Sequence, residues 1–255
     1  MHHRSGRRLA ALLVTALAVV AVSASSAFAS DQLVNKLTVG AVLVNQPKGS
    51  PWSIDLHLKA DLIDQVDQVE LPQSTLYHFK FPKAGLNASK FPVCNATKAQ
   101  FVAKHAAACP ANTQIGKGTA TAYGIGILFD NVPVYVFNGP GTDSKRTVIT
   151  YGRLLKGGID VDVPVYGTIK KTSSGFDASF PIPDIQLSDN EFAAIQNFDV
   201  RVGKRIKKGG KQVSYLDAPT ACKEGVGFPF TFDATFKSGK VVSDSKTIPC
   251  EILGV

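Results

Sequence analysis

Two segments of the chain alternate apolar and polar residues with a period of two. In residues 52–61 each apolar residue is followed by a polar one, and in residues 228–237 four phenylalanines and one alanine alternate with Pro, Thr, Asp, Thr and Lys. This period is typical of a strand with one buried face and one wet face. Ser238 and Gly239 then mark a turn, so residues 240–247 are predicted to pair back as the second strand of a hairpin.

Short β-branched and aromatic runs, separated by breaks that contain Gly, Pro or Asp, continue this pattern through the chain. They predict further strands at residues 37–44, 69–81, 118–123, 132–137, 147–154, 159–169, 175–180, 198–202 and 212–216. About a dozen strands exceed what one flat sheet comfortably holds, so we expect an all-β fold of two packed antiparallel layers, a β-sandwich. A parallel α/β fold is disfavoured because long helical patterns between the strands are missing.

Helical patterns are confined to two places. Residues 97–108 are rich in Ala, Lys and Gln and are bracketed by Cys94 and Cys109. Residues 188–195 begin with Ser188 and Glu191 at the spacing of a capping box, in which each side chain satisfies a free backbone N–H. We therefore expect one or two short helices beside the sheet.

The first residues of the chain have the order of a secretory signal peptide. Arg4, Arg7 and Arg8 precede an apolar run of 14 residues, 9–22, and the small-residue exit Ala27-Phe28-Ala29 follows that run. The run is shorter than the roughly 20 residues of a membrane-spanning helix, which favours cleavage after Ala29 over an anchor. We expect residues 1–29 to be removed and residues 30–255 to fold outside the membrane as one β domain, secreted or extracytoplasmic and without a membrane span.

The composition and net charge of the chain favour some classes of binding partner over others. The chain is 44% hydrophobic and only 19% charged, enough apolar content for a packed core and against a disordered chain. Loss of the three leader arginines leaves a mild basic excess of five. That excess favours an anionic cell-wall polymer or lipid head groups as partners, and it is too diffuse for nucleic-acid binding.

The four cysteines, Cys94, Cys109, Cys222 and Cys250, all lie after the leader. An even number in an oxidising compartment indicates disulfides, for which three pairings are possible. We prefer Cys94 with Cys109 and Cys222 with Cys250, because each pair closes a local loop worth about 3 to 4 kcal/mol. Zinc is disfavoured, since no Cys-x-x-Cys spacing occurs.

Several motifs along the chain resemble a group of uncharacterised exported β-domain proteins of actinobacteria. They are Phe91-Pro92-Val93-Cys94, residues 109–118 (CPANTQIGKG), Val136-Phe137-Asn138-Gly139, residues 218–222 (APTAC) and Thr247-Ile248-Pro249-Cys250. Together they span roughly residues 65–250. The resemblance supports the local disulfide pairing and implies no activity.

No catalytic, cofactor or metal constellation stands out. The histidines after the leader are His57, His78 and His105, and no Gly-x-Ser-x-Gly elbow accompanies them. Asp160 and Asp162 share one face of a predicted strand, without the loop spacing of a calcium site. We therefore expect a protein that is not an enzyme and carries no cofactor.

The strongest charge feature is a basic run over residues 204–211. Its five cations are Lys204, Arg205, Lys207, Lys208 and Lys211, and a Gly-Gly turn lies between the last two. Such a run can contact a polyanion, or it can be a hairpin tip whose lysines keep a strand edge exposed to water. The leading hypothesis is an exported β-sandwich that binds or decorates the cell envelope. The alternatives are a carrier that holds an apolar ligand between its sheets and, third, a secreted hydrolase.

Overall fold

The computed structural model describes residues 33–44, 53–64, 72–82, 84–218 and 227–249. Sixteen strands, one α-helix and three short 3-10 helices occur in these ranges. The strands are β1 (Leu33–Val44), β2 (Ser53–Asp64), β3 (Ser74–Pro82), β4 (Gly85–Leu86), β5 (Gln114–Gly124), β6 (Ile127–Gly141), β7 (Lys145–Lys156), β8 (Ile159–Lys171), β9 (Gly175–Pro181), β10 (Ile185–Ser188), β11 (Glu191–Val202), β12 (Arg205–Lys208), β13 (Lys211–Ser214), β14 (Leu216–Asp217), β15 (Gly227–Phe236) and β16 (Val241–Pro249). The helices are η1 (Ala88–Lys90), α1 (Lys98–Lys104), η2 (His105–Ala108) and η3 (Ala111–Thr113).

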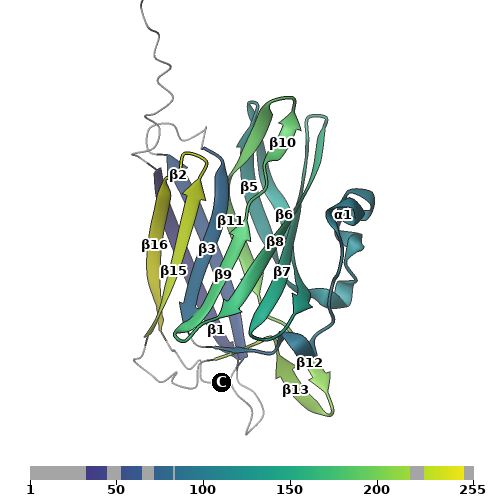
Figure 1. Cartoon of the computed structure of the whole chain (residues 1–255), viewed down its shortest axis with the longest axis vertical. Helices are drawn as coiled ribbons and strands as arrows, with labels where there is room; N and C mark the ends of the chain where they lie inside the picture. Colours follow the sequence, from purple (N-terminus) through teal and green to yellow (C-terminus); the bar gives the residue numbers. More distant parts are fainter. Residues whose placement is uncertain (1–32, 45–52, 65–71, 83, 219–226, 250–255) are drawn as a thin grey trace, which may run out of the picture.

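Fourteen strands form one antiparallel sheet rather than two separate ones. Its order is β16-β15-β3-β9-β8-β7-β6-β5-β11-β2-β14-β4, with β1 paired to β2 and β10 paired to β11. The sheet curls until β1 lies against β16, where the backbone N–H of Leu37 donates to the Asp244 carboxylate at 2.8 Å. The all-β antiparallel prediction is confirmed, and the two-layer sandwich is not: the front and back layers in Figure 1 belong to one continuous sheet.

The alternating segments lie where their pattern predicts. In β15, Phe230, Phe232, Ala234 and Phe236 are buried, while the residues between them are partly exposed. β15 pairs with β16 across the predicted turn, with Thr235 opposite Val241. The hairpin prediction is therefore confirmed.

The inner face of the curled sheet has two chemically different sides. The aromatic side comprises inward residues of β1, β3, β9 and β15, which are Leu37, Tyr77, Phe79, Phe81, Phe176, Phe180, Phe230, Phe232 and Phe236. The aliphatic side comprises inward residues of β5 to β8, which are Ala120, Ala122, Val132, Val134, Val136, Val148, Thr150, Gly152, Leu154, Val163 and Val165. The first set brings large rings to the interior and the second brings small side chains.

A third packed region lies outside the sheet. Phe101 of α1 has no exposed surface and stacks on the Tyr151 ring of β7, with ring centres 4.9 Å apart. Figure 1 shows α1 beside β7 on the outside of the sheet. The Cys94–Cys109 disulfide closes this segment, as predicted, with Cα atoms 5.3 Å apart. β6 and β7 are therefore covered on both faces.

The prediction of a second helix at residues 188–195 is wrong, because these residues form the turn between two strands and the start of the second. Ser188 and Glu191 face each other across the turn between β10 and β11, and their side chains hydrogen-bond there. Asn190 adopts a φ of 63°, a left-handed conformation that Asn tolerates in tight turns. The spacing of a capping box thus belongs here to a hairpin, and the residues after it pair with β5 and β2.

The other predicted disulfide, Cys222 with Cys250, lies outside the described residues, as do the leader and its cleavage point. No helix in the described ranges has the length and apolar character needed to cross a membrane.

Candidate functional site: an apolar cavity inside the curled sheet

The interior of the sheet contains a cavity of about 190 Å³. Side chains from β2, β3, β5 to β11 and β15 line it, together with Tyr215 and Leu216. Phe79, Phe81 and Phe180 bound it on the aromatic side, and the aliphatic side supplies the opposite wall. Because the aliphatic side carries Ala, Val, Gly and Thr where the other side carries rings, the two sides do not fill the space between them.

The cavity wall is almost entirely apolar. The lining residues with polar side chains are Thr150, Tyr77, Tyr215 and Tyr151, of which Tyr151 turns its ring to the outer face of the sheet, against Phe101. None of the lining residues is a histidine, a carboxylate or a cation. Apolar cavities of about 150 Å³ can stay dry and bind a molecule such as benzene. The space therefore suits a ligand with the size of a substituted benzene ring.

Two of the three tyrosine hydroxyls are bonded outside the cavity. Tyr151 donates to Asp162, and Tyr215 donates to Asn138 Oδ1 at 3.2 Å. Burial, and then the contact with Asp162, raises the pKa of the Tyr151 phenol, and burial raises the pKa of the Tyr215 phenol. Both phenols therefore remain protonated donors at neutral pH.

The histidines sit away from the cavity, each beside an aspartate on the outer surface. His57 Nε2 lies 2.7 Å from Asp199 Oδ1, and His78 contacts Asp177. The pattern of the sequence gives no hint of these partners, because they come from strands far apart in the chain.

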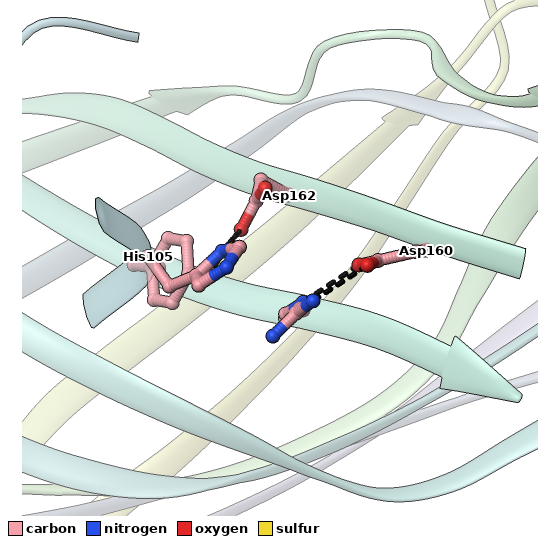
Figure 2. Close-up of polar contacts among 5 residues, drawn as sticks. His105, Asp160 and Asp162 are labelled. Carbon is pink, nitrogen blue, oxygen red and sulfur yellow. Dashed lines mark hydrogen bonds and ion pairs between the residues drawn. The ribbon is translucent and has the colours of Figure 1, made fainter. Parts of the chain in front are cut away.

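His105 belongs to the most crowded of these pairs. Its Nδ1 lies 2.9 Å from Asp162 Oδ1, and Asp160 binds Arg153, whose Nε donates at 2.6 Å (Figure 2). His105 itself has a φ of 51°, at the junction between α1 and η2. Asp162 thus anchors the disulfide-closed segment to β8, whereas Asp160 stays exposed at the surface and pairs with Arg153. Within the described ranges, no group of three His, Cys, Asp or Glu side chains is arranged to hold a metal ion.

The basic run forms β12 and β13, a separate two-stranded hairpin that projects from the end of the sheet (Figure 1). Lys204 donates to the carbonyls of Asn112 and Gln114 at 2.6 and 2.7 Å, and burial lowers its pKa. Arg205 binds both carboxylate oxygens of Asp55. Lys207, Lys208 and Lys211 are exposed at the tip. Two of the five cations thus hold the hairpin in place, and three are presented to solvent.

Comparisons with protein-family models, with curated proteins and with solved structures found no match.

Proposed function

We propose that the protein is exported, loses residues 1–29, and acts outside the membrane as a carrier of a small apolar molecule held inside its curled sheet. The observation that carries this proposal is the cavity of about 190 Å³ with an apolar wall. Transfer of an apolar molecule from water into such a space is favourable, because it removes apolar surface from water at about 25 cal/mol per Å². No reaction is assigned to the protein.

The surroundings of the cavity support binding over catalysis. A hydrolase needs a nucleophile or base beside its substrate, with a geometry that orients them. His105 and its acidic neighbours lie outside the sheet beneath the disulfide-closed segment, and the lining residues include no acid or base. An occupant of the cavity would therefore meet no group suited to attack it.

Binding of ethylbenzene tests the carrier proposal. Gly152 is on the aliphatic side, and a Cβ added there meets its nearest neighbour, Val132 Cγ1, at 3.5 Å, an ordinary contact distance. Gly152→Leu should therefore place its side chain in the cavity. Residues 30–255 should bind ethylbenzene with one-to-one stoichiometry in titration calorimetry, and Gly152→Leu should weaken binding at least tenfold.

Val102→Leu is the matched control, because Val102 is 56% exposed on α1 and its side chain lies outside the sheet. Its affinity for ethylbenzene should equal that of the wild type. Equal binding by the wild type and Gly152→Leu, or no saturable binding by either, would refute the carrier proposal.

The hairpin tip favours a second function, attachment to an anionic polymer of the cell envelope. Lys207, Lys208 and Lys211 stand together on an element that projects from the sheet. Lys207→Gln with Lys208→Gln should reduce co-sedimentation with isolated anionic cell wall, and the effect should fade with added salt. Lys170→Gln with Lys171→Gln, which removes two exposed charges from the end of β8, should leave sedimentation unchanged. Equal losses in both double variants would assign the effect to net charge and not to the hairpin.

A further inference from the structure

Two exposed cations lie side by side at the base of the basic hairpin. Arg201 of β11 is directly opposite Lys117 of β5 in the register of the sheet. Both side chains are exposed, and neither has an ion-pair or hydrogen-bond partner in the described part of the chain. The row continues with His57 of β2 on one side and Tyr135 of β6 on the other, so no carboxylate stands opposite either cation. Like charges directly opposite each other destabilise a sheet, so this root pair, Lys117 and Arg201, is a local cost that an anion would relieve.

The acids at the neighbouring positions of β2 and β11 are engaged with other groups. Asp199, two residues before Arg201 on β11, lies with its Oδ1 2.7 Å from His57 Nε2. Asp55, two residues before His57 on β2, binds Arg205 through both carboxylate oxygens. The positive charge of the root pair is therefore open to an anion from outside the protein.

A short segment of chain joins the root pair to the exposed end of the hairpin, which leaves the sheet just beyond β11 (Figure 1). Lys204 ties this segment to the sheet, because its Nζ donates to the carbonyls of Asn112 and Gln114 at 2.6 and 2.7 Å. From Arg201 to Lys208 the chain advances seven residues, a span of no more than about 25 Å even when fully extended. The tip cations are the three exposed lysines of the hairpin, which also have no acidic partner among the described residues: Lys207, Lys208 and Lys211.

We propose that the root pair and the tip cations are two subsites for one extended polymer of repeating phosphate groups in the cell envelope. This inference rests on the proposed attachment function and specifies its partner and a second contact. A phosphate group is tetrahedral, so the Arg201 guanidinium and the Lys117 ammonium can approach it from two sides, whereas a planar carboxylate is matched by the guanidinium alone. A polymer that reaches both subsites binds more tightly than a short anion, because its second contact is intramolecular.

Long-chain linear polyphosphate and tripolyphosphate are the probes, and titration calorimetry measures both. Lys117→Gln with Arg201→Gln should weaken binding of the long chain about tenfold, because the second contact is lost, and should weaken binding of tripolyphosphate by no more than about twofold. The slope of log affinity for the long chain against log salt concentration should become shallower by about 1.5, as expected for the loss of two phosphate contacts. An unchanged affinity and slope would overturn the inference.

Lys36→Gln with Lys59→Gln is the matched control, because it removes the same charge from the same face of the sheet beside an acid. Lys59 Nζ lies 3.6 Å from Asp61 Oδ2, and Lys36 is directly opposite Asp61 in the register. This variant should keep the affinity for the long chain within about twofold of the wild type, since Asp61 already compensates the charges that it removes. An equal loss in the control and in the root variant would assign the effect to net charge and overturn the inference.

Two further measurements sharpen the assignment. Without ligand, the root variant should have a midpoint of thermal unfolding at least as high as that of the wild type, because it loses a repulsion between neighbouring strands. A clear drop would mean that the two cations have a partner within the protein, which would overturn the inference. The root substitution should weaken binding of polyglutamate less than that of polyphosphate, and an equal loss would overturn the assignment to phosphate.

The outcomes separate the second subsite from the attachment function. If Lys207→Gln with Lys208→Gln reduces co-sedimentation with cell wall but the root variant binds long-chain polyphosphate as the wild type does, the second subsite is overturned and attachment through the hairpin stands. If the wild type neither sediments with cell wall nor binds polyphosphate, both proposals are overturned.

Discussion

The aromatic and aliphatic sides of the interior begin from the same strand periodicity and reach different packing. On the aromatic side, Phe79 and Phe232 stack with ring centres 4.6 Å apart, and Phe81 lies within 5.9 Å of Phe230. On the aliphatic side, small residues such as Gly152 and Ala122 face the interior, and the cavity borders them. The alternation of apolar and polar residues fixes which face is buried, whereas the volume of the inward residues decides whether the buried space is filled.

The largest expected effect compares the same truncation on each side. Leu37 is packed among the rings of the aromatic side, whereas Leu154 borders the cavity. Leu37→Ala should lower the free energy of unfolding by about 4 kcal/mol and Leu154→Ala by about 2 to 3 kcal/mol, because part of the Leu154 surface borders empty space and makes no packing contact there. Equilibrium denaturation in urea measures both. A larger loss at Leu154 would mean that the cavity is not empty in the purified protein.

The outer face of the aliphatic side depends on a covalent bond. The Cys94–Cys109 disulfide spans 15 residues and closes the segment that covers β6 and β7. Replacing both cysteines by alanine should lower the free energy of unfolding by about 3 kcal/mol, mainly because the unfolded chain without the cross-link has more conformational entropy. Each single variant should lose a similar amount, since either one removes the bond; a single variant with near wild-type stability would contradict this explanation.

Gly152 of β7 and Gly167 of β8 have different amounts of free space beside them, and adding one methyl group at each position tests this difference. A Cβ at Gly167 would overlap the ring of Phe180, whereas a Cβ at Gly152 makes only ordinary contacts. Gly167→Ala should therefore destabilise by about 2 kcal/mol, and Gly152→Ala should stabilise by about 0.5 to 1 kcal/mol because alanine loses less backbone entropy in a strand. Thermal unfolding followed by circular dichroism gives the two signs. Loss of stability at both positions would show that the interior beside Gly152 is packed as tightly as the contact between Gly167 and Phe180.

The strands and the buried face of each were predictable because they depend on local order along the chain. The inward phenylalanines of residues 228–237 are a direct reading of a period of two, and the disulfide of residues 94–109 follows from a short loop. The joining of the sheet into one curled layer was not predictable, because β1 meets β16 across some 200 residues and the decisive contact, Leu37 N–H to Asp244, leaves no local pattern.

The candidate site was only partly predictable from the sequence. A carrier was among the hypotheses, yet the cavity depends on side-chain volumes from many strands and was not assignable to residues. The basic run was visible, but its division into holding and exposed cations depends on Asp55, which is distant in sequence.

The smallest expected effect concerns the contact that brings β1 to β16 and closes the sheet beside the aromatic side. Burial of the Asp244 carboxyl raises its pKa, but the hydrogen bonds from Leu37 and Ser245 and the ion pair with Lys246 outweigh it, so the pKa is lowered overall. A carboxyl whose pKa is lowered by folding contributes stability above its unfolded pKa of about 4, and that stability is lost as the pH falls through the folded pKa.

Asp244→Asn keeps an acceptor for Leu37 but cannot ionise. It should therefore lower the unfolding free energy at pH 7 by less than about 1 kcal/mol, since the carboxylate is partly solvated, and should reduce the loss of stability between pH 5 and pH 2.5. Asp189→Asn, in the exposed turn between β10 and β11, is the control and should follow the wild-type pH profile. If Asp244→Asn loses stability with acid as steeply as the wild type, the closure of the sheet does not depend on this charge, and the aromatic side is held shut by its packed rings alone.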